Sequence, residues 1–207
     1  MAYPERVTES RAAVKRIVVS RLPTRSGPFD IYGYRAADGV EHVALVAGPL
    51  PLKSPVLVRI HSECLTGEVF GSLRCDCRAQ LDLALDRISA KQSGVVVYLR
   101  GQEGRGIGLI NKLRAYTLQD QGYNTVDANR ELGFPVDARD YSAAVAILRD
   151  LGATEIRLMT NNPDKVGAVA SAGITVVERV PIVIASNIDN EDYLRTKQDE
   201  LGHLFGS

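Results

Sequence analysis

The chain contains three cysteines, Cys64, Cys75 and Cys77, and all three lie in one short window with the spacing C-x10-C-x-C. Thiolates are soft ligands that zinc binds well, and three protein ligands with a fourth position left for water are typical of a catalytic zinc site. The spacing therefore predicts that these cysteines hold one zinc ion.

The flanking residues argue against three ordinary core thiols. Free cysteine is usually buried as a small hydrophobe among apolar neighbours. Here Cys75 and Cys77 stand on either side of Asp76, and Arg74 and Arg78 are adjacent to them. Charged neighbours of this kind favour a metal site over a hydrophobic interior.

The segment RIHSE, residues 59–63, places a histidine and a glutamate directly before the first cysteine. His61 could complete a closed Cys3His zinc site, which would be structural rather than catalytic. The pair His61-x-Glu63 also resembles the zinc deaminase signature, but that signature requires P-C-x-x-C downstream and this chain has only Cys75-x-Cys77. A strand end that carries polar residues without a function is a further alternative.

Hydrophobic patterning predicts strands in the first third of the chain and an alternation of helices and strands after it. The strands are short, rich in β-branched residues and separated by Gly, Pro and Asp. This order indicates an α/β fold, with α+β as the alternative, built as a mixed β-sheet with flanking helices in a single domain. The predicted strands are residues 17–22, 28–34, 42–48, 55–62, 95–99, 156–159 and 174–180.

Helices are predicted where apolar residues recur at i, i+3, i+4 and i+7. A helix over residues 107–121 is expected to turn Ile110, Leu113 and Thr117 inward, and residues 190–205 are expected to form a closing helix. Two other stripes are Leu81, Ala84, Leu85 and Ile88, and Tyr141, Ala144, Val145 and Leu148.

Composition places the chain among soluble globular proteins, because 45% of its 207 residues are hydrophobic and 24% are charged. Lys+Arg and Asp+Glu balance at 25 each, so neither nucleic acid nor an anionic membrane is an expected partner. Residues 1–15 are expected to form a solvated, partly disordered arm and residues 16–207 the catalytic domain. The clustered, odd number of cysteines and the lack of a signal or membrane segment indicate a reducing cytoplasm.

A glycine-rich segment, GQEGRGIGLINK, lies between the strand at residues 95–99 and the next helix. Glycines before a helix let backbone N–H groups point at an anion, and Arg105 adds a bidentate partner for phosphate. The segment is neither a Walker A loop nor G-x-G-x-x-G, because Gly104, Gly106 and Gly108 are evenly spaced. A phosphate-binding loop and a tight strand-to-helix turn both fit it.

Two later loops also carry polar residues. FPVDARDY places Asp137 and Arg139 before a helix, where Asp140 is interpreted as a cap. MTNNPDK places Thr160 and Lys165 around a strand-to-helix turn, and loops at the carboxyl ends of strands are where open α/β sheets bind ligands. The asparagines ahead of Pro163 are interpreted as helix caps.

Together, HSECLTGEVFGSLRCDC, QEGRGIGLINKLRAYTLQD, DARDY and TNNPDK, in this order, closely resemble GTP cyclohydrolase II, from about residue 16 to residue 205. The resemblance implies opening of the imidazole ring of GTP with release of formate and pyrophosphate. The product would be 2,5-diamino-6-(5-phosphoribosylamino)-pyrimidin-4(3H)-one, the committed step toward riboflavin. No segment for the companion 3,4-dihydroxy-2-butanone 4-phosphate synthase precedes Arg16, so the monofunctional form is expected.

The resemblance also implies roles for individual residues. It makes the three cysteines zinc ligands, Asp137 a proton acceptor, Arg139 a nucleophile on the α-phosphate, and Tyr116 a participant in ring opening. It further implies Mg²⁺ with the triphosphate and a homodimer. A zinc-dependent nucleotide deaminase and a non-catalytic zinc module that binds nucleic acid are the alternatives. The residues implied in GTP binding are Arg59, Ile60, His61, Ser62, Glu63, Gln80, Glu103, Gly104, Arg105, Thr125, Thr160 and Lys165.

Overall fold

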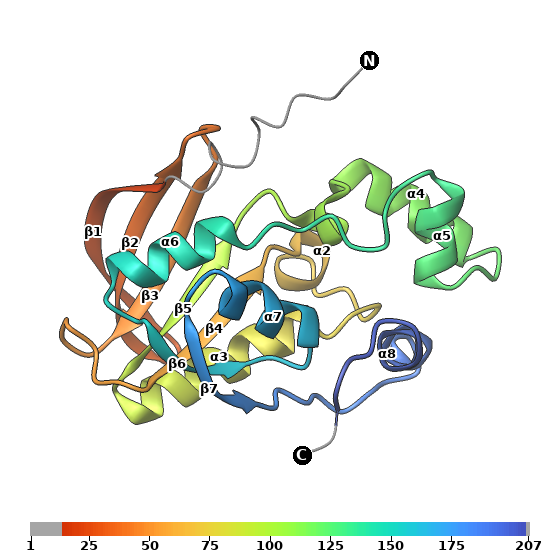
Figure 1. The fold of residues 1–207 in the computed structure, drawn as a ribbon. Helices are drawn as coiled ribbons and strands as arrows, with labels where there is room; N and C mark the ends of the chain where they lie inside the picture. Colours follow the sequence, from red (N-terminus) through yellow and green to blue (C-terminus); the bar gives the residue numbers. More distant parts are fainter. Residues whose placement is uncertain (1–13, 206–207) are drawn as a thin grey trace.

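A mixed β-sheet forms the centre of the computed structural model, which describes residues 14–205 (Figure 1). Its first strand begins inside the predicted arm, of which residues 1–13 lie outside the described part. The elements are β1 (Val14–Thr24), β2 (Gly27–Ala36), β3 (Glu41–Ala47), β4 (Val56–Ser62), α2 (Leu65–Glu68), α3 (Cys77–Lys91), β5 (Gly94–Leu99), the 3-10 turn η1 (Glu103–Gly106), α4 (Leu109–Gln119), α5 (Thr125–Glu131), α6 (Ser142–Asp150), β6 (Glu155–Met159), α7 (Pro163–Ser171), β7 (Thr175–Val180) and α8 (Glu191–Asp199).

The sheet joins an antiparallel half to a parallel half. Within the described residues its strand order is β1-β2-β3-β5-β4-β6-β7. Strands β1, β2, β3 and β5 pair antiparallel, whereas β5, β4, β6 and β7 pair parallel. The predicted mixed sheet is confirmed, and each of the seven predicted strands is present.

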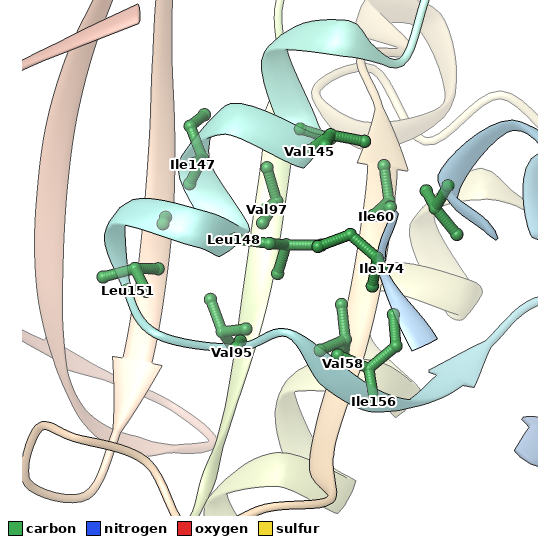
Figure 2. Close-up of a cluster of buried hydrophobic side chains, with 14 of the residues drawn as sticks. Val58, Ile60, Val95, Val97, Val145, Ile147, Leu148, Leu151, Ile156 and Ile174 are labelled. Atoms are coloured by element: carbon green, nitrogen blue, oxygen red, sulfur yellow. The ribbon is translucent and has the colours of Figure 1, made fainter. Parts of the chain in front are cut away.

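Helices cover both faces of this sheet. On one face, α6 and α7 pack against inward side chains of β4, β5 and β6, and Figure 2 shows Leu148 of α6 lying among Val58, Val97 and Ile174. On the other face, α3 contributes Ala84 and Ile88 to a smaller core. Since a strand buried on both faces reads as a continuous apolar run, β4 begins with Val-Leu-Val.

Strand β4 changes character toward its carboxyl end on one face only. Successive side chains of a strand point to opposite faces, so Val58 and Ile60 lie in the core under α6. On the α3 face, Leu57 is apolar, but Arg59 and His61 follow it and both are buried. These two buried polar side chains therefore need hydrogen-bond partners inside the protein, at this end of the sheet.

The expected orientation of α4 is wrong. Ile110 and Leu113 are 63% and 44% exposed, Thr117 is exposed as well, and Ala115 is the buried residue. The stripe rule assumes that a helix packs on an apolar core, whereas the inward face of α4 lines a polar pocket. Its first turn is also shifted, because α4 begins at Leu109 after the η1 turn.

Three other details refine the predicted helices. The closing helix spans only Glu191–Asp199, and the short α2 and α5 were not predicted. Asn162, which precedes Pro163, caps α7 as expected, because its side chain accepts a hydrogen bond from the Asp164 N–H group. Asp140 likewise accepts from the Ser142 N–H group at the start of α6. Within residues 14–205, none of the helices has the length and hydrophobicity of a membrane span.

Replacing Leu148 by Ala tests the larger core. Leu148 is fully buried, so Leu148→Ala is expected to lower the free energy of unfolding by about 2–5 kcal/mol. The matched control is Leu113→Ala on the exposed side of α4, which is expected to change it by less than about 0.5 kcal/mol. Urea denaturation of both variants measures the difference, and equal losses would contradict the orientation of α4.

Candidate active site

The candidate site lies at the carboxyl ends of β4, β5 and β6. The chain leaves β4 toward the face that α3 covers, whereas it leaves β6 toward the face that α7 covers. A crevice opens where neighbouring parallel strands send their connections to opposite faces, and open α/β sheets bind ligands there. The loops after these strands carry the cysteines, the glycine-rich segment and TNNPDK.

The three cysteines converge. Cys64 follows β4, and Cys75 and Cys77 lie at the start of α3, yet their sulfur atoms all lie within 4.8 Å of one another. The Cys64 and Cys75 sulfur atoms are 3.8 Å apart. In the described part of the chain this is the one group of three or more His, Cys, Asp or Glu residues able to hold a metal ion. Three thiolates at this separation fit tetrahedral zinc.

Gly67 makes the convergence possible. It lies in α2, and a Cβ atom at this position would be 2.7 Å from the Cys75 sulfur and 3.2 Å from the Cys64 sulfur. Any other residue would push the sulfur atoms apart. The glycine of HSECLTGEV is therefore part of the thiol cluster.

The pKa values of the three thiols shift in different directions. Hydrogen bonds from the Cys75 and Cys77 thiols, together with the positive charge of Lys112, lower the pKa of Cys64. The same hydrogen bonds to Cys64, together with burial, raise the pKa of Cys75 and of Cys77. Metal binding would displace the remaining thiol protons, because zinc binds the thiolate form of cysteine.

His61 takes no part in the thiol cluster. Its Nε2 atom lies 2.9 Å from Oε1 of Glu68, and its ring stacks on Tyr98 with centroids 5.7 Å apart. Glu68 also accepts hydrogen bonds from the Cys64 N–H group at 2.9 Å and from the Tyr98 hydroxyl at 2.6 Å. The proposed closed Cys3His site is therefore not formed, and His61 instead helps to hold Glu68, which fixes the backbone at Cys64.

Two neighbouring pockets meet at the thiol cluster. The first, called here the thiol pocket, lies between the cysteines and α4. It contains a tyrosine whose hydroxyl is 3.3 Å from Oγ1 of Thr66, and burial raises the pKa of this Tyr116, so its hydroxyl stays protonated. Its polar and charged lining includes Glu63, Glu103, Arg105, Lys112, Tyr116, Gln119, Thr125 and Arg139.

The second pocket, called here the cationic pocket, lies between the ends of β4 and β6 and the C-terminal segment. Arg105 and Arg139 line both pockets and separate them. Both terminal guanidinium nitrogens of Arg105 are buried and have no partner among the described protein atoms. A buried polar group without a partner is costly, so this arginine points to an anionic ligand. The cations that line the pocket are Arg59, Arg105, Arg139, Lys165 and Lys197.

A chain of buried hydrogen bonds connects the two pockets. Arg59 donates to the Met159 carbonyl at 2.9 Å and to Gln80 at 2.6 Å. Gln80 donates to Asp76 at 2.6 Å, and Lys197 of α8 donates to the other Asp76 oxygen at 2.9 Å. Because Asp76 stands between two of the cysteines, the thiol cluster is tied to both β4 and α8.

Lys165 lies deep in the cationic pocket. Its ammonium donates to the Ile60 carbonyl at 2.9 Å, and it lies 5.2 Å from the ring centroid of Tyr141. Burial and the charges of Arg59 and Arg139 lower the pKa of Lys165. An anion bound beside it would relieve this repulsion and favour the charged ammonium.

Asp137 and Arg139 form an ion pair next to the pockets. Nε of Arg139 lies 2.9 and 3.1 Å from the two Asp137 oxygens, and one terminal nitrogen also donates to Asp137. Burial would lower the pKa of Arg139, but the hydrogen bonds and charge of Asp137 raise it above its usual range. The guanidinium is therefore held as a cation.

The structure brings together nearly all of the residues predicted for the site. Two of them do not line either pocket: the Ile60 side chain lies in the core under α6, and Asp137 lies behind Arg139. Thr125 opens α5 and lines the thiol pocket. The Oγ1 atom of Thr160 accepts from the Asn162 N–H group at the wall of the cationic pocket.

Sequence reasoning missed pocket residues that only tertiary structure assembles. Lys112 faces the thiols from α4, whereas Tyr193, Lys197 and His203 come from the C-terminal segment. A helical spacing of four between Tyr193 and Lys197 was the available signal, because it places both on one face of α8. The Lys197 ammonium lies 4.4 Å from the Tyr193 ring centroid.

The fold and the thiol cluster thus define an open α/β site with three cysteines that could hold a metal ion. The family model of GTP cyclohydrolase II matches residues 15–181, most of the chain. The chain belongs to the GTP cyclohydrolase II family.

Two curated relatives support this assignment. The chain is 57% identical to the riboflavin biosynthesis protein RibBA of Salinispora tropica, over 93% of this chain and 48% of that protein. It is 53% identical to the monofunctional riboflavin biosynthesis protein RIBA 3, chloroplastic, of Arabidopsis thaliana, over 93% of this chain and 38% of that protein. Among solved structures, a two-domain 3,4-dihydroxy-2-butanone 4-phosphate synthase from A. baumannii is similar at 20% identity and a TM-score of 0.46, over 83% of this chain and 40% of that one. The chain spans about half the length of the bacterial relative and less than half the length of the plant relative.

Gly67→Ala tests the geometry of the thiol cluster. The added methyl group would collide with two sulfur atoms, so we expect zinc affinity to fall by about 10-fold or more. The matched control is Gly167→Ala in α7, where nothing lies within 4 Å of the new Cβ atom. That control should bind zinc normally and gain roughly 0.5–1 kcal/mol of stability. Chelator competition measures both affinities, and normal zinc binding by Gly67→Ala would refute the tight packing.

Proposed function

We propose that the chain catalyses zinc-dependent hydrolysis of GTP to 2,5-diamino-6-(5-phosphoribosylamino)-pyrimidin-4(3H)-one, formate and pyrophosphate, a step of riboflavin biosynthesis. The observation that carries the proposal is the meeting of a three-cysteine cluster with a cation-lined pocket at one end of the sheet. Family membership supports the same activity.

The thiol pocket suits the purine. Cys64, Cys75 and Cys77 would hold zinc, which supplies a Lewis acid that activates water for attack on the imidazole ring. Tyr116 has a protonated hydroxyl near the cysteines, where it can donate a proton to the opening ring. Glu63 stands at the same wall with one oxygen accepting from the Gly101 N–H group at 2.7 Å. We propose that Glu63 orients the purine base.

The cationic pocket suits the triphosphate. Arg105 lines both pockets and has two nitrogens without a hydrogen-bond partner, so it can form a bidentate contact with the phosphate next to the ribose. Arg59 and Lys165 lie deeper. The uncharged contributions come from Gln80 and Thr160, which line the same pocket.

Asp137 and Arg139 act on the phosphate that is cleaved. The resemblance gives Arg139 the role of nucleophile with Asp137 as proton acceptor. A guanidinium attacks only when it is deprotonated, and the ion pair raises the pKa of Arg139. We therefore propose that Arg139 stabilises negative charge on the α-phosphate and that Asp137 orients it.

The remaining expectations concern ions and assembly. Mg²⁺ would arrive with the triphosphate, because it is usually held by phosphate oxygens and few protein carboxylates. A reducing cytoplasm would keep the three cysteines free for zinc. We also propose a homodimer, on family grounds. The deaminase alternative gains nothing from the geometry, since His61 is bonded to Glu68 and lies outside the thiol cluster.

Measuring products from GTP tests the proposal directly. The zinc-loaded protein should release formate and pyrophosphate, whereas a deaminase would release ammonia without formate. Cys75→Ser should bind zinc poorly and release no formate, because a hydroxyl is a weaker zinc ligand than a thiolate. If zinc acts only on the ring, this variant should still release pyrophosphate.

Arg139→Ala serves as the complementary control. It should lose both products if phosphate chemistry comes first, and formate release near the wild-type rate would contradict that order. Full zinc occupancy in a variant lacking all three cysteines would refute the metal site itself.

Tyr116→Phe separates ring opening from packing. It removes one hydroxyl and keeps the ring, so folding and GTP binding should be unchanged while formate release falls by about 10²-fold. Pyrophosphate release should fall less. A variant that unfolds at lower temperature but is fully active per folded molecule would make Tyr116 a structural residue only.

A further inference from the structure

Lys112 is the charged residue of α4 that reaches the cysteines. Its ammonium lies 3.1 Å from the Cys64 sulfur, 2.8 Å from Oγ1 of Thr66 and 2.5 Å from Oε1 of Glu103. The side chain is 11% exposed. None of the roles implied by the family resemblance involves this lysine.

The ammonium is held in one orientation. It has three N–H donors and no acceptor, and each of the three neighbouring atoms can accept one of them. Glu103 is fixed in turn, since its other oxygen accepts from the Leu65 N–H group at 2.6 Å. Glu103 thereby ties the glycine-rich turn to the loop that carries Cys64 and aims Lys112 at the sulfur atom.

The positive charge of Lys112 can act on a metal ion held by the three thiolates. Three thiolates and one Zn²⁺ ion carry a net charge of minus one, which weakens the ion as a Lewis acid compared with neutral ligands. A cation in hydrogen-bond contact with one sulfur draws electron density away from that sulfur and so reduces its donation to the metal. Lys112 is the one Lys or Arg of the described residues with a hydrogen bond to a cysteine sulfur.

We propose that Lys112 is a positioning residue of the zinc centre, whose hydrogen bond to Cys64 offsets thiolate charge and keeps the ion electrophilic. The inference rests on the proposed function and deepens it. Thr66 extends the arrangement, because its hydroxyl contacts both the Lys112 ammonium and the Tyr116 hydroxyl. One lysine thus links the metal ligand to the proposed proton donor.

A buried ion pair with Glu103 alone would be a purely structural role, and spectroscopy distinguishes the two. Lys112→Met removes the charge and the donors at similar length, Lys112→Arg keeps a cation, and Arg114→Met removes an exposed cation two residues along the same helix. Each protein is loaded with Co²⁺, whose sulfur-to-metal charge-transfer band reports electron donation by the thiolates. Removing a hydrogen bond raises the energy of the sulfur lone pairs and moves this band to longer wavelength.

The expected result is a red-shifted band in Lys112→Met, a smaller shift in Lys112→Arg and none in Arg114→Met. With zinc, formate release by Lys112→Met should fall about 10–100-fold, while binding of a non-hydrolysable GTP analogue stays within about twofold. Thermal unfolding and one Co²⁺ per chain verify that each variant is folded and loaded. Failure of Lys112→Met alone to bind Co²⁺, with Lys112→Arg loaded, would also support the proposal.

An unshifted band in folded, loaded Lys112→Met would overturn the proposal, as would undiminished formate release. The cobalt measurement involves no GTP. A wild-type zinc protein that makes no formate would therefore reject the proposed function, while the band position would still decide whether Lys112 tunes the metal.

Discussion

The burial of Arg59 is the constraint on which the site depends. Strand alternation places this arginine under α3, where an unpaired charge would be very costly. Its partners are the Met159 carbonyl and Gln80, and Gln80 in turn binds Asp76. Because Asp76 also binds Lys197, satisfying one buried cation brings together β4, β6, α3 and α8. The cationic pocket lies against this network, because Arg59, Gln80 and Lys197 line it.

The same network positions the three cysteines. Asp76 is held from two sides, so the turn that carries Cys75 and Cys77 cannot move without breaking a buried ion pair. Glu68 holds Cys64 in a similar way, because its carboxylate accepts a hydrogen bond from the backbone N–H group of Cys64. The cysteines are thus preorganised from both ends of the loop that joins them, and Gly67 provides the space in between. Preorganisation of this kind lowers the cost of assembling a metal site.

The sequence predicted the features that local rules govern. β-Branched runs identified the strands, Asn162 was correctly interpreted as a cap, and cysteine spacing identified the thiol cluster. It failed where tertiary context decides. The stripe on α4 was assigned inward because periodicity cannot distinguish an apolar core from a polar pocket, so Lys112 was overlooked. Lys197 was overlooked because its partner, Asp76, is 121 residues away in the chain.

The distribution of charge within the site differs from the neutral balance of the whole chain. Its 25 basic and 25 acidic residues cancel overall, but the two pockets differ in charge. The thiol pocket carries both signs, whereas the cationic pocket is lined by five Lys and Arg side chains and, among the described residues, by no carboxylate. The charged residues of the thiol pocket are Glu63, Glu103, Arg74, Arg105, Lys112 and Arg139. Such a gradient would orient a nucleotide, because reversing it would place phosphates against thiolates and carboxylates. Arg105 and Arg139 line both pockets, so they would lie near the ribose and the α-phosphate of a nucleotide that spans the two. Under the proposed function, the placement of the carboxylates at one pocket would favour one direction of binding, without a long-range field that would draw other polyanions to the protein.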